Sequence, residues 1–217
     1  MHQNKVILWD WDNTLADTLD IIWRAQNVMR QHYGLSPWSK AEAKQAMNHS
    51  GRDLIKNCVG ANQVAQAQQY FWQAYATFVE QLKLKEAAQE TLNYAKSLGF
   101  YNILASNKVQ NVLCQEARRL NILSSFDRVI GAEQTAKDKP SKVFTDKALE
   151  GLSPQLIIAV GDGLSDVKMG HNYPNGVSVL VFTDAKTSEF NTEKPDYTAK
   201  DLHACQKILK MLAEKSI

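Results

Sequence analysis

Two pairs of acidic residues stand where a chemical site would need them. Asp10 and Asp12 follow the short apolar run Val6–Trp9 and are separated by one residue. In an extended segment both carboxylates would share a face and repel each other, which raises the pKa of one of them unless a cation or a turn intervenes. An Asx-rich turn, in which Asp and Asn side chains bind nearby backbone groups, accounts for the same pattern. Both interpretations are open at this point.

A second acidic pair, Asp162 and Asp166, follows the apolar run Leu156–Val160. Asp166 alone would serve as a favourable negative charge at a helix N-terminus. Four acids at one edge of a parallel sheet, however, would repel each other strongly without a divalent cation. Ligands that offer only oxygen favour magnesium. The sequence therefore predicts a metal site with Mg²⁺ as the cofactor.

The ends of two further expected strands add a hydroxyl, an amide and a cation. Ser106 and Asn107 come after the run Tyr101–Ala105, where we expect a helix to begin. They would either cap that helix or, together with its free N–H groups, bind a phosphate. Lys139 comes after the strand expected at 128–131. A lysine before proline is usually a surface residue, but near four carboxylates and an anion it would balance their charge.

The elements that must position these residues alternate between strand and helix. Several runs rich in β-formers are continuously apolar, as expected for strands covered on both faces of a parallel sheet. Helical patterns separate the later strands and close the chain, which indicates an α/β fold with a doubly wound parallel sheet. The expected strands are 6–9, 101–105, 128–131, 156–160 and 177–182, and the expected helices after them are 109–120, 143–152, 166–171 and 201–215.

A long segment after the first strand breaks this alternation. Apolar residues recur there at a spacing of three or four, in one run from Leu15 to Tyr33 and in another from Phe71 to Leu82, which is typical of amphipathic helices. A crossover between parallel strands normally needs far fewer residues. We therefore expect an all-helical insertion at 17–86, with the α/β core formed by 1–16 and 87–217.

Taken together, these residues resemble the four ordered motifs of the haloacid dehalogenase-like superfamily, in particular its phosphatases with a helical cap, similar to phosphoglycolate phosphatase. The resemblance covers nearly the whole chain and implies a Rossmann-like core with the inserted helices as the cap. The motifs fall, in chain order, on Asp10, Asp12 and Thr14, on Ser106, on Lys139, and on Asp162 and Asp166.

The resemblance also implies roles for these residues. Asp10 would be the nucleophile that forms an aspartyl-phosphate, and Asp12 would be the general acid and then the general base. Thr14, Ser106 and Asn107 would bind substrate, and Lys139 would be the catalytic cation. Magnesium would be held by Asp10, by the backbone carbonyl of Asp12, and by Asp162 and Asp166.

Some positions depart from the family pattern. Asn13 stands where many members carry glycine, a change that is tolerated since asparagine also adopts positive φ. Gly163 replaces a residue that is often polar. The third motif continues as KPSKVF, so Lys142 is an alternative to Lys139.

In similar proteins a loop of the cap selects the substrate. The best local candidate is the polar stretch 49–53, which we place between helical segments. Arg52 could clamp an anionic group there. A surface turn with a solvated arginine explains the stretch equally well.

The expected activity is magnesium-dependent hydrolysis of a small phosphorylated metabolite. A sugar-phosphate mutase is one alternative, because it would use the same core and cap. A phospho-ligand binding module without catalysis is another, and the intact acidic set argues against it. Dehalogenase relatives lack the second acid that Asp12 supplies.

Composition limits the other classes of function. The 217 residues carry 25 basic and 23 acidic side chains, a net charge of +2, which is too even for a nucleic-acid partner. No apolar run is long enough for a membrane span. Three scattered cysteines suit a reducing compartment, so we expect a cytoplasmic protein. Oligomeric state and the identity of the substrate are not encoded in any pattern that we find.

Overall fold

The structure, a computed structural model, describes residues 4–47, 51–183 and 190–215. The chain divides into two compact units. The first, here called the core unit, comprises Met1–Ala16 and Leu84–Ile217, and the second, the helical unit, comprises Asp17–Lys83.

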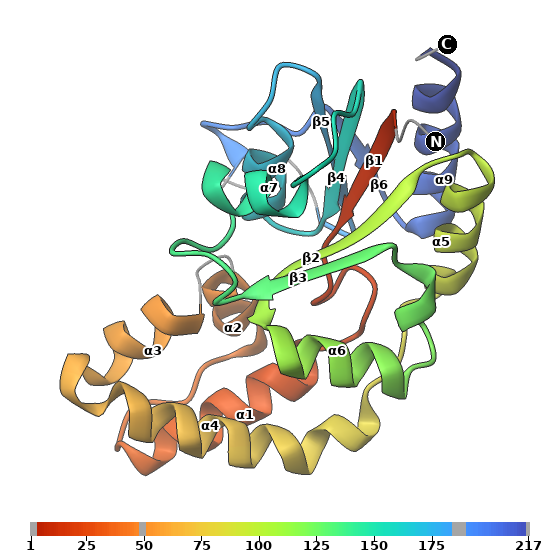
Figure 1. The fold of residues 1–217 in the computed structure, drawn as a ribbon. Helices are drawn as coiled ribbons and strands as arrows, with labels where there is room; N and C mark the ends of the chain where they lie inside the picture. The colour runs from red at the N-terminus through yellow and green to blue at the C-terminus, as the bar shows by residue number, and fades with distance from the viewer. Residues whose placement is uncertain (1–3, 48–50, 184–189, 216–217) are drawn as a thin grey trace. The chain divides into compact units, whose positions relative to one another are not determined.

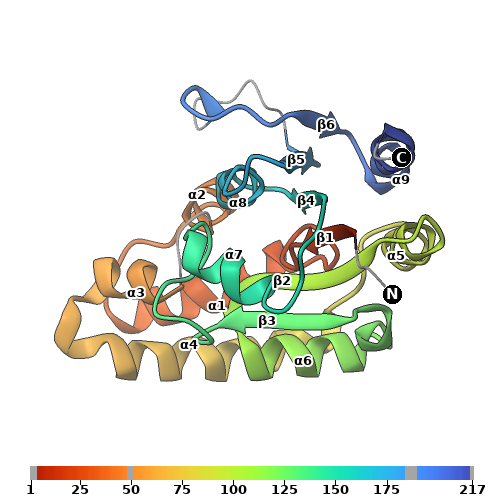
Figure 2. The ribbon, with the colours of Figure 1, turned by 45° about the horizontal axis from the view of Figure 1, so that its top comes forward.

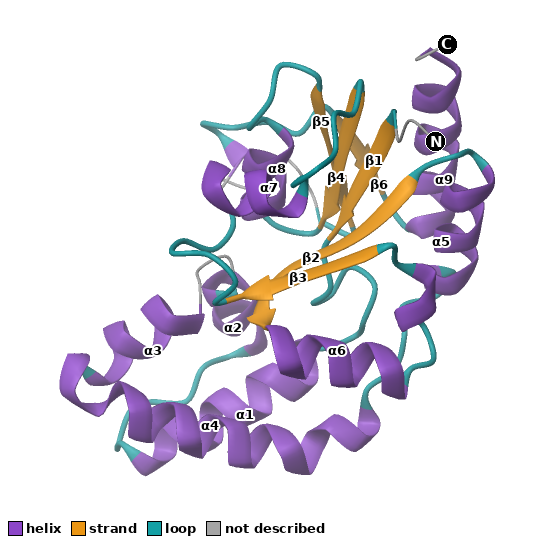
Figure 3. Ribbon diagram, viewed as in Figure 1, coloured by secondary structure: helices purple, strands orange, loops and turns teal. Residues whose placement is uncertain are grey.

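In the described part of the core unit, six strands form one parallel sheet (Figures 1 and 3). Their order across the sheet is β3-β2-β1-β4-β5-β6. The chain therefore moves outward in one direction from β1 and then restarts on its other side with β4. In such sheets ligands bind at the carboxyl ends of the two strands where the order reverses, here β1 and β4. The strands are β1 Lys5–Trp9, β2 Tyr101–Val109, β3 Arg128–Ala132, β4 Leu156–Gly161, β5 Gly176–Val181 and β6 Tyr197–Ala199.

Helices cover both faces of this sheet, with α7 and α8 on one side and α5 and α9 on the other (Figure 2). Successive β1 residues alternate between the two faces, and all four of Val6–Trp9 are fully buried. This explains why the first strand is a continuous apolar run. The helices of the core unit are α5 Ala88–Ser97, α6 Gln110–Arg119, α7 Lys142–Ala148, α8 Leu164–Gly170 and α9 Leu202–Lys215.

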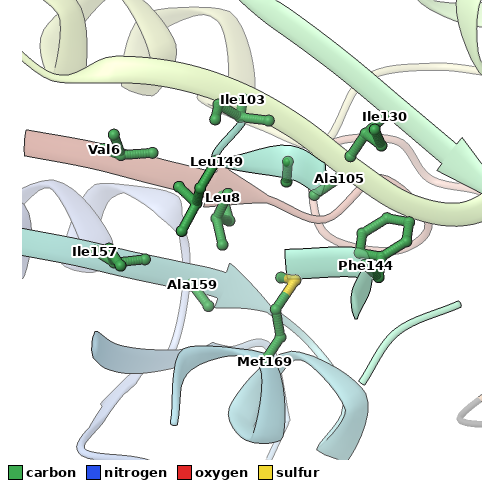
Figure 4. Packing of buried hydrophobic residues seen from close by; sticks show 11 residues of the cluster. Val6, Leu8, Ile103, Ala105, Ile130, Phe144, Leu149, Ile157, Ala159 and Met169 are labelled. Atoms are coloured by element: carbon green, nitrogen blue, oxygen red, sulfur yellow. The ribbon is translucent and has the colours of Figure 1, made fainter. Parts of the chain in front are cut away.

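An apolar cluster lies between the sheet and the helices α7 and α8 (Figure 4). It brings Phe144 of α7 and Met169 of α8 together with Leu8 of β1. These contacts fix the ends of β1 and β4, from which the acidic residues extend. The cluster consists of Val6, Leu8, Ile103, Ala105, Ile130, Phe144, Ala148, Leu149, Ile157, Ala159 and Met169.

The helical unit contains no strand among its described residues. Its two longest helices, α1 and α4, pack against each other. A capping box begins α2: Glu42 N–H donates to Ser39 Oγ over 3.2 Å, and Ser39 N–H donates to Glu42 Oε2 over 2.7 Å. The helices are α1 Leu19–His32, α2 Lys40–Ala46, α3 Gly51–Val59 and α4 Val64–Phe78. None of the described helices of either unit is long and apolar enough to cross a membrane.

The expected α/β class and doubly wound parallel sheet are confirmed, and the edge strand β6 was missed. It has only three residues, Tyr197–Ala199, too few to give a periodic pattern. The helix expected at 109–120 is confirmed as α6, Gln110–Arg119, but the expectation that Ser106 and Asn107 stand at its start is wrong, because β2 continues to Val109. Val109 pairs with Ala132 of β3 after a register shift, which keeps the chain extended past Ser106.

An ionic cluster ties the end of α8 to the segment before β6. His171 Nδ1 lies 2.7 Å from Glu193 Oε1, and Nε2 lies 2.9 Å from Asp196 Oδ2. Ser178 donates to the same Asp196 oxygen from its backbone N–H and from its hydroxyl, each over 2.8 Å. Burial opposes the charged imidazolium, but the hydrogen bonds and charges of Glu193 and Asp196 outweigh it and raise the pKa of His171.

This cluster predicts a pH-dependent part of the folding free energy. Because the pKa of His171 is higher in the folded than in the unfolded chain, its contribution is fully present below the unfolded value and is lost as pH rises through the folded value. We expect His171→Gln to destabilise the protein more at about pH 6 than at about pH 8.5. Urea unfolding at both pH values measures this, with exposed His203→Gln as the control. An equal loss at both pH values would contradict the assignment.

Candidate active site

The turn after β1 brings the first acidic pair to the edge of the sheet. Trp11 C=O accepts hydrogen bonds from the backbone N–H groups of Thr14, Leu15 and Ala16, over 3.3, 3.1 and 3.0 Å. This tight turn requires a positive φ at Asn13, which is 60°. The expectation that asparagine takes the left-handed conformation there is confirmed.

Asp10 is buried, and both of its carboxylate oxygens have partners. Thr14 Oγ1 donates to Oδ2 over 2.9 Å, and Lys139 Nζ donates to Oδ1 over 2.6 Å. The Asp10 N–H donates to Val160 C=O of the neighbouring strand over 2.9 Å. The carboxylate is thus held in one orientation by a hydroxyl from its own turn and by a cation from a distant part of the chain.

Lys139 joins the two acidic pairs. Its ammonium, which is 2% exposed, donates to Asp10 Oδ1 and, over 2.7 Å, to Asp166 Oδ1. Asn107 holds the backbone of Lys139 from β2: Lys139 N–H donates to Asn107 Oδ1 over 2.8 Å, and Asn107 Nδ2 donates to Lys139 C=O over 3.2 Å. Lys142, the alternative in the sequence, instead contacts Asp146 and Tyr173 at the surface.

The loop after β4 packs closely around Asp166. A Cβ atom added to Gly161 would lie 2.1 Å from Asp166 Cγ, so no larger residue fits there. Gly163 N–H donates to Asp166 Oδ2 over 3.2 Å. Thr183, just past β5, donates from its hydroxyl to Asp162 C=O over 2.8 Å. These contacts place Asp162 and Asp166 beside the end of β1.

Three of the acids form a cluster that could hold a metal ion. One carboxylate oxygen from each of Asp10, Asp162 and Asp166 lies within 4.8 Å of the others. The pKa of Asp10 is raised to about 7: burial is the largest cause, the charges of Asp166 and Asp12 act in the same direction, and Lys139 opposes them. Burial disfavours the ammonium of Lys139, but the carboxylates of Asp10 and Asp166 outweigh it and hold its pKa above the usual range.

The cluster gathers three carboxylates in a largely buried space, and Lys139 contacts two of them, Asp10 and Asp166. Carboxylate oxygens are the ligands that a hard divalent cation takes. The donor set therefore fits magnesium.

Asp12 is held from a different side. Lys108 Nζ lies 2.8 Å from Asp12 Oδ1 and 2.8 Å from Glu116 Oε2. Sequence reasoning missed both partners. Lys108 directly follows Ser106 and Asn107, and Glu116 is a charged residue on the buried face of α6, a signal that the apolar periodicity could have supplied.

The remaining predicted residues are placed as follows. Ser106 is buried near the end of β2 and accepts a hydrogen bond from Lys108 N–H over 3.2 Å. Arg52 lies in α3, which begins at Gly51, so the expectation that residues 51–53 lie between helical segments is wrong. Residues 49 and 50 of that stretch, like the Arg52 side chain, lie outside what the structure describes.

Comparison with known proteins identifies the family. The family model described as haloacid dehalogenase-like hydrolase matches residues 7–181. A phosphoglycolate phosphatase of Chromobacterium violaceum is 25% identical over 174 residues, covering 75% of this chain and 78% of that protein. One from Aquifex aeolicus is 25% identical over 197 residues, covering 89% and 91%. Among solved structures, a haloacid dehalogenase-like hydrolase of Streptococcus pneumoniae shares the fold, with a TM-score of 0.80 at 18% identity over 98% of this chain and 100% of that one.

Proposed function

This chain belongs to the haloacid dehalogenase-like hydrolases, and from that premise we propose that it is a magnesium-dependent phosphatase of small phosphate monoesters. The observation that carries the proposal is the buried Asp10 carboxylate, oriented by Thr14 and by the Lys139 cation that it shares with Asp166. The phosphoglycolate phosphatases among its relatives support the same reaction class.

In the first half of the reaction an oxygen of Asp10 attacks phosphorus, and the bond from phosphorus to the leaving oxygen breaks. Asp12, protonated at this stage, gives its proton to that leaving oxygen, so the product departs as an alcohol. Lys139 balances charge on the phosphoryl group as it is transferred. Ser106 and Asn107, both at the end of β2, are our proposed substrate-binding residues.

In the second half water attacks the phosphorus of the aspartyl-phosphate. The Asp12 carboxylate takes a proton from that water, the bond between phosphorus and Asp10 breaks, and inorganic phosphate leaves. Asp10 returns as a carboxylate and Asp12 as an acid. In this mechanism Asp10 is the nucleophile and Asp12 is the acid and base. Each has its own cation, since Lys139 contacts Asp10 and Lys108 contacts Asp12.

We propose that Mg²⁺ is bound by Asp10, Asp162 and Asp166, with the backbone carbonyl of Asp12 as a further ligand. When bound, the ion offsets the negative charge of the cluster and of the phosphoryl group. We further propose residues 17–86 as a cap that contributes to substrate choice, with Arg52 as its candidate contact to an anionic group. The cytoplasmic location stays a prediction.

Magnesium dependence tests this function. After treatment with a chelator we expect no release of phosphate from 2-phosphoglycolate or from a panel of phosphorylated metabolites, and we expect activity to return with Mg²⁺. Added Mg²⁺ should also raise the unfolding temperature, because a ligand of the folded state stabilises it. Asp166→Asn should weaken both effects.

Full activity after chelation would contradict the proposal. Conversion of a hexose 1-phosphate to its isomer without phosphate release would instead favour a mutase. Binding of phosphorylated ligands without any turnover would favour a binding module.

A further inference from the structure

A second set of buried charged groups lies beside Asp12. The side chains of Lys108 and Glu116 are 4% and 3% exposed, and Trp11 is fully buried. Lys108 Nζ lies between Asp12 Oδ1 and Glu116 Oε2, 2.8 Å from each. The Asp12 side chain itself is 19% exposed, so one end of this chain of contacts is buried and the other is accessible.

Two separate contacts converge on a single oxygen of Glu116. Trp11 Nε1 donates to Oε2 over 2.7 Å, and Lys108 Nζ donates to the same atom over 2.8 Å. Trp11 is the residue between the two acids of the turn, so its indole anchors the backbone there. Lys108 anchors the carboxylate of Asp12. Glu116 on α6 thus positions both the backbone and the side chain.

Stability alone does not explain this arrangement. Burying charged groups costs free energy, and well-packed apolar residues in place of a buried ion pair are often neutral or stabilising. Hydrogen bonds from Trp11 and Lys108 to Glu116 rigidify this buried group, and the ion pair from Lys108 Nζ to Asp12 Oδ1 extends from it. Here the group held at the accessible end is Asp12.

We propose that Lys108 and Glu116 are positioning residues that orient the Asp12 carboxylate for proton transfer. This inference rests on the proposed function. Lys108 engages Oδ1, and Oδ2 is the oxygen that gives its proton to the leaving group and later takes one from water. Trp11 completes the arrangement by fixing Glu116 against the turn between Asp10 and Asp12.

The test compares two substrates that differ in their need for a general acid. The alkyl phosphate 2-phosphoglycolate releases glycolate, a poor leaving group that needs the proton from Asp12, whereas p-nitrophenyl phosphate releases p-nitrophenolate, which leaves readily without one. The ratio of kcat/KM for the two substrates isolates this step, since kcat/KM covers the reaction only through formation of the aspartyl-phosphate. Asp12→Asn removes the general acid altogether and should therefore give the largest change in this ratio, on the order of 10²- to 10⁴-fold.

We expect Lys108→Met to lower kcat/KM for the alkyl phosphate about tenfold or more beyond its effect on the aryl phosphate. Lys108→Arg should restore part of the ratio. Glu116→Gln keeps the shape of the side chain, and the positive charge of Lys108 still balances the negative charge of Asp12. We therefore expect this variant to fold even if Lys108→Met does not. It should shift the ratio in the same direction by a smaller factor.

Lys142→Met is the matched control, because that ammonium contacts only surface partners among the described residues, and its ratio should equal that of the wild type. Equal losses on both substrates for Lys108→Met and Glu116→Gln, or no loss on either, would overturn the inference. Those results would leave the proposed phosphatase function of the wild-type protein standing, whereas an inactive wild-type protein would refute that function instead.

Discussion

Asp10→Asn is expected to abolish phosphatase turnover, by a factor on the order of 10⁴ or more, while the chain keeps its fold. An amide has no carboxylate oxygen to attack phosphorus, so the covalent intermediate cannot form. The fold should survive because the pKa of this buried carboxylate is raised to about 7, with burial as the largest cause, so a neutral amide of similar shape removes a disfavoured charge. Thr14 Oγ1 can still donate to the amide oxygen.

Phosphate release from 2-phosphoglycolate and p-nitrophenyl phosphate measures the loss, and thermal unfolding checks the fold. Asp146→Asn is the matched control, since Asp146 is half-exposed and contacts Lys142 and Tyr173 away from the cluster. It should keep wild-type activity. Near-normal turnover by a folded Asp10→Asn protein would remove Asp10 from the mechanism.

The second large effect is expected for Lys139→Met, which should lower both the rate of turnover and the free energy of unfolding. The ammonium donates to Asp10 over 2.6 Å and to Asp166 over 2.7 Å in a buried site, so its removal leaves those carboxylates without their cation. We expect turnover to fall on the order of 10²- to 10³-fold, as for the loss of a preorganised donor. The free energy of unfolding without metal should fall by about 3 kcal/mol.

Added Mg²⁺ should restore part of that stability, because the ion supplies positive charge to the same carboxylates. Urea unfolding with and without Mg²⁺ measures both quantities. Lys142→Met, three residues further along the chain, should leave rate and stability close to the wild type. If Lys142→Met were the damaging change and Lys139→Met were harmless, the third motif would be assigned to the wrong lysine.

The acidic part of the site could be predicted from sequence because its residues follow strands with a strong apolar signal. Asp10 and Asp162 come directly after the buried runs of β1 and β4, and adjacent parallel strands bring their carboxyl ends together. The choice between Lys139 and Lys142 could not be predicted, since both follow β3 within a few residues. It depends on two hydrogen bonds between Asn107 and the Lys139 backbone, which join positions 32 residues apart.

The groups beside Asp12 were harder still to foresee. Trp11 and Glu116 are 105 residues apart, and only the packing of α6 against the sheet makes them neighbours. A buried glutamate on an amphipathic helix indicates a partner but does not say which. The strands and most core helices were foreseen to within a few residues, whereas β6 and the extension of β2 to Val109 depend on pairing with neighbouring strands.

The most direct measurement of the central claim is to trap the covalent intermediate. Wild-type protein is mixed with Mg²⁺ and p-nitrophenyl phosphate, whose leaving group needs no proton from Asp12, and is then quenched rapidly in acid and digested, and the peptide that contains Asp10 is examined by mass spectrometry. The mechanism predicts one phosphoryl group on Asp10 that appears before inorganic phosphate, accumulates in Asp12→Asn and is absent from Asp10→Asn. Turnover with no phosphoryl group on Asp10 at any time, or with one on another residue, would contradict it.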